Sequence, residues 1–252
     1  MSVNPDGSEL DTLVIDIQYS YVHLGDWSPD ARKLVFRLIS YIRPSEGGIH
    51  VINPDGSGKL RLDEGYDPRF CGNDKVVYSG YDGSIFIIGL DGQGKTQLQP
   101  PPFASGLSRP VGSPDGKKVA FCRTLVVPPP TQACWLEIMK PDGSGHTKLA
   151  EIRGVHSFAE IEFSPDSKRV LFLAVGETSA EIYTINIDGS GLRALTGKSA
   201  MGECARWSRD GSQIVFTSMR DGNQEIYTVN TDGPPILRRL THDPANDYNP
   251  DW

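Results

Sequence analysis

The sequence predicts an all-β fold, a β-propeller of four-stranded antiparallel blades, and three observations lead to it. Short β-rich runs recur along the chain, a polar turn precedes each run, and an Asp-Gly turn follows it. The recurrence interval is 42, 43, 51 and 44 residues by subtraction, and intervals of about 40 to 50 residues are typical of propellers and related arrays. The aromatic residues that mark the runs are Phe36, Tyr78, Phe121, Phe172 and Phe216.

Each unit is expected to contain four strands, a to d, joined by two tight turns. The a–b turns combine Ser, Pro, Asp, Asn and Gly, which favour turns through fixed φ, side-chain bonds to the backbone or tolerance of positive φ. They fall at residues 28–30, 72–74, 113–116, 164–166 and 208–211. The c–d turns are Asp-Gly pairs, a strong hairpin signal, at residues 55–56, 91–92, 142–143, 188–189 and 232–233. Before the a–b turn, four units carry a core-type aromatic and the third carries Gly112.

The repeats divide the chain into one propeller domain over residues 1–252. Five full blades are expected at about 21–66, 67–106, 107–154, 155–200 and 201–246. Residues 1–15 match the end of a blade and residues 247–252 match its beginning, so both termini are expected to contribute to a sixth, partial blade. A fragment of a longer array fits the same pattern.

The repeat resembles that of the TolB-type propellers, a WD40-like family whose blades read W-S-P-D-G and then I-Y-x-x-N-x-D-G. The fifth unit matches best, with Trp207-Ser208-Arg209-Asp210-Gly211 followed by Ile226-Tyr227 and Asp232-Gly233. The second unit departs most, with Phe70-Cys71-Gly72-Asn73-Asp74 at the turn. The resemblance implies a periplasmic or extracytoplasmic location and three kinds of role: an interaction module, a domain of a larger peptidase, or a lyase.

Composition excludes several classes of function. The net charge of −7 argues against nucleic acid or an anionic membrane as the main partner, since both need clustered Lys and Arg. The sequence contains no run of about 18 apolar residues, so no membrane span is predicted. The first residues lack the pattern of a secretion signal. A Gly-x-Ser-x-Gly elbow is absent, which argues against a serine hydrolase. No cofactor is expected, and the chain is expected to be a monomer.

The positions just before the strand-a aromatic predict a charged channel. They hold Asp26, Arg69, Glu162, Arg206 and Asp251, with Val111 in the third unit. Neighbouring charges mostly alternate in sign, so the residues either line a ligand-selecting channel or form ion pairs between blades. Three histidines, His23, His156 and His242, precede a strand a near the channel, but none has metal-ligand spacing, so no metal site is predicted.

The favoured function is a non-catalytic scaffold that binds a protein on the face formed by the b–c and d–a loops, where the sequence is irregular. The candidate contact residues are Phe103, Leu125, Val126, Val127 and Tyr41, with Tyr21 nearby. Prolines beside Phe103 stiffen its loop, which lowers the entropy lost on binding. The alternatives are a propeller enzyme with a site at the channel mouth and a structural domain of a larger protein.

Two cysteines of the third unit flank three prolines. Cys122 and Cys134 are equally far from Pro128, which predicts that they lie nearly opposite each other in a hairpin, within reach of a disulfide. Two reduced, buried thiols are the other interpretation, because a free cysteine packs as a small apolar residue.

Overall fold

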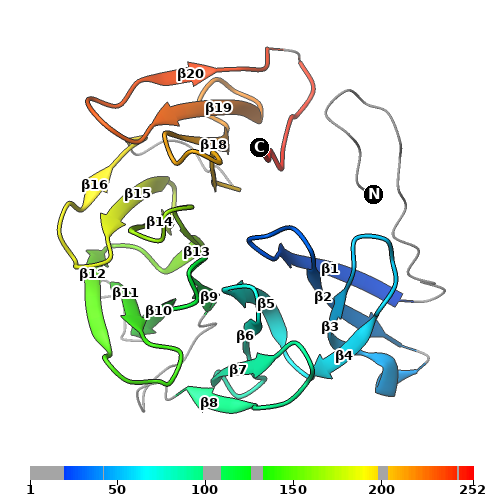
Figure 1. Ribbon diagram of the computed structural model, residues 1–252. Helices are drawn as coiled ribbons and strands as arrows, with labels where there is room; N and C mark the ends of the chain where they lie inside the picture. The colour runs from blue at the N-terminus through cyan, green and yellow to red at the C-terminus, as the bar shows by residue number, and fades with distance from the viewer. Residues whose placement is uncertain (1–19, 42, 99–108, 126–132, 198–203, 243) are drawn as a thin grey trace.

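The computed structural model describes residues 20–252 except 42, 99–108, 126–132, 198–203 and 243, and shows five four-stranded antiparallel sheets. We call them blades one to five in chain order. They surround a centre, with the first strand of each blade innermost and the last outermost (Figure 1). The predicted all-β propeller fold is confirmed. The described part of the chain contains no helix with the length and apolar character needed to cross a bilayer.

The strands follow one another in order within every blade. Blade one contains β1 (Ser20–Trp27), β2 (Leu34–Ser40), β3 (Gly48–Ile52) and β4 (Leu60–Asp63), with a single 3-10 turn, η1 (Pro44–Glu46). Blade two contains β5 (Tyr66–Cys71), β6 (Lys75–Ser79), β7 (Ile85–Gly89) and β8 (Thr96–Leu98). Blade three contains β9 (Val111–Gly112), β10 (Val119–Leu125), β11 (Ala133–Met139) and β12 (Thr147–Arg153). Blade four contains β13 (Ser157–Phe163), β14 (Arg169–Val175), β15 (Ala180–Asn186) and β16 (Arg193–Ala194). Blade five contains β17 (Arg206–Trp207), β18 (Gln213–Ser218), β19 (Glu225–Asn230) and β20 (Leu237–Arg239).

Four of the five a–b turns share one set of side-chain hydrogen bonds. In blade four the Ser164 hydroxyl donates to Asp166 at 2.6 Å and accepts the backbone N–H of Arg169 at 2.9 Å. The same serine-to-aspartate bond closes the turns of blades one, three and five, at 2.7 Å in each. These bonds replace backbone hydrogen bonds that a tight turn cannot make, so the turn motif repeats for a structural reason.

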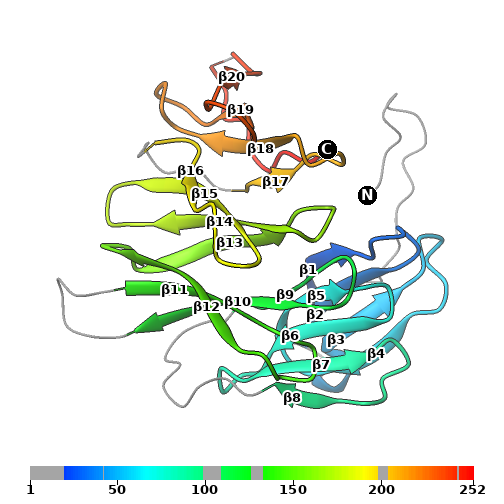
Figure 2. The same cartoon turned by 60° about the vertical axis from the view of Figure 1, so that its left-hand side comes forward.

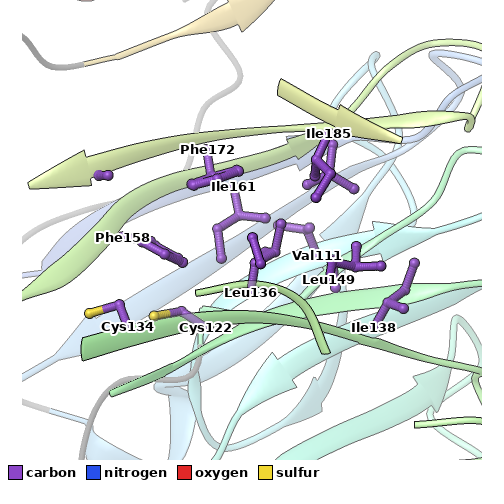
Figure 3. Close-up of a cluster of buried hydrophobic side chains, with 14 of the residues drawn as sticks. Val111, Cys122, Cys134, Leu136, Ile138, Leu149, Phe158, Ile161, Phe172 and Ile185 are labelled. Carbon is purple, nitrogen blue, oxygen red and sulfur yellow. The ribbon is translucent and has the colours of Figure 1, made fainter. Parts of the chain in front are cut away.

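The apolar core lies between the blades, which stack face to face (Figure 2). One cluster joins blades three and four around Phe172 (Figure 3). Phe172 also stacks on Tyr183 at a centroid distance of 5.3 Å. A central strand is therefore buried on both sides, and five consecutive residues of β14 are buried. This explains why strand b reads as a continuous apolar run and not as an alternating one.

The C-terminal residues lie against blade five. The backbone N–H of Asp247 donates to the Gln224 carbonyl at 2.8 Å, and the Trp252 indole donates to the Arg206 carbonyl at 3.3 Å. Residues 1–15, the other half of the expected sixth blade, lie outside the described residues, so that blade stays a prediction.

The expected register of the two cysteines is wrong by two residues. Cys122 pairs with Leu136, and Cys134 pairs with Thr124, so neither cysteine lies directly opposite the other. The cysteines are therefore diagonal neighbours on one buried face (Figure 3) and both are free thiols. Their mutual hydrogen bond and burial raise the pKa of the Cys122 thiol.

Candidate functional site

A cavity of about 670 Å³ lies at the centre of the propeller, and residues of all five blades line it. All five charged residues expected in the channel lie on its walls, namely Asp26, Arg69, Glu162, Arg206 and Asp251. Because each sits at the same position of its repeat, the inner strands bring them together although they are far apart in sequence. A cavity of this size is in the range of small-molecule and peptide sites.

Irregularities in the inner strands aim these side chains. The pairing of β1 with β2 shifts between Leu24 and Asp26, and that of β5 with β6 shifts between Tyr66 and Arg69. The pairing of β13 with β14 shifts between Phe158 and Ile161, directly before Glu162. Bulges of this kind re-aim side chains and are frequent beside functional sites. The repeat pattern of the sequence predicts the charged positions but not the bulges.

Gly25 in the β1 bulge allows blades one and two to approach closely. A Cβ atom there would lie 2.6 Å from the Pro68 carbonyl oxygen, closer than real Cβ atoms come. The Arg69 guanidinium uses this proximity and donates to the Gly25 carbonyl at 2.8 Å. One cationic group of the cavity is thus held by the backbone of the neighbouring blade.

Blade three contributes no charge, and its glycine has a packing reason. A Cβ atom on Gly112 would lie 2.3 Å from Cα of Cys71, inside β5. β9 therefore presses against β5 at the point where the other repeats carry an aromatic side chain. The missing aromatic of the third unit is explained by this contact.

Two half-buried carboxyl groups of the cavity, those of Asp26 and Glu162, are shifted toward their neutral forms. Burial raises the pKa of Glu162 to about 8, although Arg206 and the backbone N–H of Trp207 favour its charged form. Burial also raises the pKa of Asp26, against the effect of Arg69 and Arg206. A carboxyl group with a pKa of about 8 is mostly protonated at neutral pH, so the cavity holds two guanidinium groups and an acid that can donate a proton.

The direct ion pair of Arg206 is with Glu160, at 3.0 Å, and not with one of the other predicted channel residues. Among the described residues, no two of those five lie within ion-pair distance of each other. They interact through the longer-range fields that oppose the rise in the pKa of Asp26 and Glu162. The cavity is thus a charged pocket more than a ring of paired side chains.

The outer end of the cavity opens at the a–b turns, where Pro29, Pro114 and Pro165 form part of the wall together with Trp27, Trp207 and Trp252. From the sequence, the contacts with a partner protein are expected on the opposite face, which the b–c and d–a loops form. Each turn is short and regular when considered alone, but turn residues of blades one, three, four and five line one common space.

The opposite face carries paired tyrosines on blades one and two. Tyr21 and Tyr41 meet edge to face at 5.9 Å, and Tyr66 and Tyr81 lie 6.0 Å apart. Arg37 of blade one reaches over the Tyr81 ring of blade two at 6.0 Å, so blade one also contacts the second pair. Tyr21, Tyr41 and Tyr81 are 65%, 68% and 66% exposed. We call these four tyrosines the tyrosine face.

The tyrosine face includes Tyr41 and Tyr21, which the sequence analysis named, and Tyr66 and Tyr81, which it missed. Their signal was available, because they flank strands a and b of the second unit as Tyr21 and Tyr41 do in the first. Leu125 is the last residue of β10, and the structure describes its backbone but not its side chain. Phe103, Val126 and Val127 lie outside the described residues.

The described residues contain no group of three His, Cys, Asp or Glu side chains that could hold a metal ion. His50 is buried and stacks on Phe36, and His146 contacts Glu137 at 2.8 Å. His23, His156 and His242 are exposed and do not form a cluster.

The fold and the charged central cavity define this protein as a β-propeller with a polar channel. It belongs to the TolB β-propeller domain family, whose profile matches residues 85–252. No curated protein sequence matches it significantly.

Solved structures share the fold at low identity. An oligogalacturonate lyase in complex with manganese superposes with a TM-score of 0.70 at 18% identity, over 91% of this chain and 68% of that one. TolB from Acinetobacter baumannii gives 0.61 at 16% identity, over 92% and 55%. A puromycin-hydrolysing peptidase from Mycobacterium tuberculosis gives 0.63 at 16% identity, over 88% and 39%. The chain thus spans about half of TolB and less of the peptidase, and the neighbours include enzymes as well as TolB.

Proposed function

We propose that this chain is a protein-binding propeller and that the partner contacts the tyrosine face. One observation carries the proposal: two tyrosine pairs lie on adjacent blades, and three of their four rings are exposed on the face of the b–c and d–a loops. Without a bound partner, the three most exposed rings of the tyrosine face present apolar surface to water. Tyrosine is enriched at protein interfaces because its ring is apolar and its hydroxyl can bond.

The contacts within the tyrosine face hold it ready for binding. Edge-to-face packing restrains Tyr21 and Tyr41, and the cation–π contact of Arg37 restrains Tyr81. Side chains that are already ordered lose less entropy when a partner binds. Such clusters of aromatic residues and arginine are typical of the positions that dominate binding energy.

Site-specific cross-linking tests this proposal. Benzoylphenylalanine is placed at Tyr81 and, as a control, at Tyr248, which is 65% exposed and outside the tyrosine face. After irradiation in the native host, a defined cross-linked protein is expected from position 81 and not from position 248. Identical products from both positions, or none from position 81, would contradict the proposal.

The cross-linked partner then allows an affinity measurement. Tyr81→Ala and Tyr21→Ala are each expected to weaken binding by about 1 to 3 kcal/mol, as at an interface hot spot, whereas Tyr248→Ala should have no effect. Thermal unfolding of each variant checks that the fold is retained. A folded Tyr81→Ala protein with unchanged affinity would remove the tyrosine face from the interface.

The central cavity favours a second candidate, an enzyme. A carboxyl group with a pKa of about 8 beside two arginines can act as a general acid on an anionic substrate. The lyase among the structural neighbours acts on an acidic saccharide, which suggests oligogalacturonate as the first substrate to test. The described residues do not offer a ligand set for manganese, so no step is derived through that metal. Ultraviolet absorbance of unsaturated product, lost in Glu162→Gln, would favour the enzyme.

A further inference from the structure

A second large cavity, of about 810 Å³, lies between blades two and three, away from the central channel. Its lining includes four lysines, which we call the lysine groove: Lys75, Lys117, Lys118 and Lys140. Ile87 and Ile88 of β7 form an apolar floor, and Asp142 is the one carboxylate in the lining. The groove therefore concentrates positive charge on a chain whose net charge is −7.

The groove exists because two blades depart from the repeat at the end of strand c. Blades one, four and five carry an asparagine there, at Asn53, Asn186 and Asn230. These asparagines bond within their c–d turns, as Asn186 does to Ser190 at 3.0 Å. Blade two has Gly89 at this position and blade three has Lys140. Neither residue carries the side-chain amide that makes these bonds, and both residues line the groove.

The same departure leaves Lys118 without the asparagine partner that its equivalent has in blade one. The equivalent Lys33 of blade one donates to Asn53 at 2.6 Å. The equivalent Arg169 of blade four pairs with Asp232 at 3.2 Å and lies 4.9 Å from the centre of the Trp207 ring. Lys118 faces Lys140 where blade one has that asparagine.

Three of the four lysines have no ion pair in the described structure. Lys117 reaches Asp115 at 3.5 Å, on the surface. No described carboxylate lies within 4 Å of the ammonium groups of Lys75, Lys118 or Lys140. Like charges gathered around one apolar floor repel one another, and an anionic ligand would relieve that repulsion.

We propose that the lysine groove binds an extended acidic peptide segment of a partner protein. The charges come from β6, from the a–b turn of blade three and from the end of β11, so they suit several carboxylates spaced along a chain. A single phosphate group is better held by an arginine fork than by separate lysines. Nucleic acid is disfavoured by the net charge of the rest of the chain. The groove lies on the a–b and c–d turn side, so the proposal is independent of the tyrosine face.

Fluorescence anisotropy of a labelled acidic peptide tests the proposal. The probe is a fluorescein-labelled peptide in which glutamate alternates with leucine, and a lysine–leucine peptide is its counterpart. The acidic peptide is expected to bind at about 50 mM salt and to dissociate at about 500 mM, where charges are screened within a few ångströms. Binding of neither peptide, or equal binding of both, overturns the proposal.

Substitutions then place the peptide. Lys118→Gln with Lys140→Gln is expected to weaken binding about tenfold, or about 1.4 kcal/mol. Lys140→Asn restores the residue of the other repeats and should weaken binding in the same direction. Lys59→Gln with Lys168→Gln is the matched control, because it removes the same charge from exposed positions on corresponding turns of blades one and four. An equal loss in this control would show non-specific attraction and overturn the proposal.

A footprint on the unaltered protein avoids dependence on variants. Bound peptide is expected to protect Lys118 and Lys140 from acetylation and to leave Lys59 and Lys168 reactive. Uniform reactivity with the peptide bound overturns the proposal. Two competitors decide the ligand class: displacement by millimolar inorganic phosphate, or tighter binding of a single-stranded oligonucleotide than of the peptide, would assign the groove to that ligand and overturn the proposal.

Discussion

The indole of Trp252 donates to the backbone carbonyl of Arg206 at 3.3 Å, as the indole of Trp207 donates to the carbonyl of Glu162 at 3.4 Å. Each tryptophan thus bonds to the inner strand that precedes it in the ring. The C-terminal tryptophan occupies, relative to blade five, the place that Trp207 occupies relative to blade four. The first strands of blades four and five, β13 and β17, are therefore held by a tryptophan side chain as well as by blade packing.

These two bonds predict unequal effects of the same substitution. Trp207→Phe is expected to lower the free energy of unfolding by about 1 to 3 kcal/mol, because Trp207 is only 5% exposed and its loss leaves a buried carbonyl unbonded. Trp252→Phe should cost less, because Trp252 is 47% exposed and water can replace it. Urea unfolding followed by circular dichroism measures both. Equal losses of unfolding free energy in the two variants would contradict the difference expected from burial.

The close contact of Gly112 with β5 predicts that position 112 tolerates no side chain. Gly112→Ala is expected to destabilise the protein by at least about 1 to 3 kcal/mol, because the new methyl group would overlap the backbone of Cys71. Gly176→Ala is the matched control. Neither glycine has a positive φ, and a Cβ atom at position 176 would meet nothing closer than 3.2 Å. Similar urea midpoints for the two variants would show that β9 can move away from β5.

Turn chemistry explains why the fold could be predicted and why parts of the site could not. The Ser-Pro-Asp and Asp-Gly turns are determined within a few residues, so they mark the strands wherever they occur. The inner position of Asp26 and Glu162 follows from the repeat. The bulges before Asp26 and Arg69 depend on the contact between neighbouring blades, which no local pattern records. The predicted strand partner of Cys122 was wrong because a one-residue change in the centre of a hairpin shifts the partner of every strand residue by two positions.

The corrected register predicts that Cys122 and Cys134 stay reduced. Diagonal neighbours on a sheet are about 7–8 Å apart at Cα, beyond the usual span of a disulfide. Protein unfolded without reductant should therefore show all four thiols to Ellman's reagent. In the folded protein Cys204 should react first, because the other three are fully buried.

A control variant isolates the pair. Cys122→Ala with Cys134→Ala should lower the count of the unfolded protein from four to two and leave the first native reaction unchanged. A count of two in the unaltered protein, unchanged in the double variant, would instead show that these two residues form a bridge.

Glu162 predicts a pH-dependent contribution to stability. Its pKa is raised from 4.5 to about 8 in the folded protein, mainly by burial, so the folded state keeps a proton that the unfolded chain releases. The stabilisation from that proton is complete below pH 4.5 and is lost as the pH rises through 8. Glu162→Gln carries a neutral side chain of the same shape at every pH. The difference in melting temperature, variant minus unaltered protein, should therefore grow from pH 5 to pH 9 in the variant's favour, within the range that the two pKa values define.

Circular dichroism melts at several pH values in one ionic strength measure this difference, and all other titrating groups cancel in it to a first approximation. Glu177→Gln, an exposed position between β14 and β15, controls for the loss of one formal charge and is expected to show a constant difference. Parallel melting curves for Glu162→Gln and the unaltered protein from pH 5 to pH 9 would show that Glu162 is already ionised at pH 5. The cavity would then hold a carboxylate instead of an acid, and the candidate general acid of the enzyme hypothesis would be lost, while the protein-binding proposal on the tyrosine face would be unaffected.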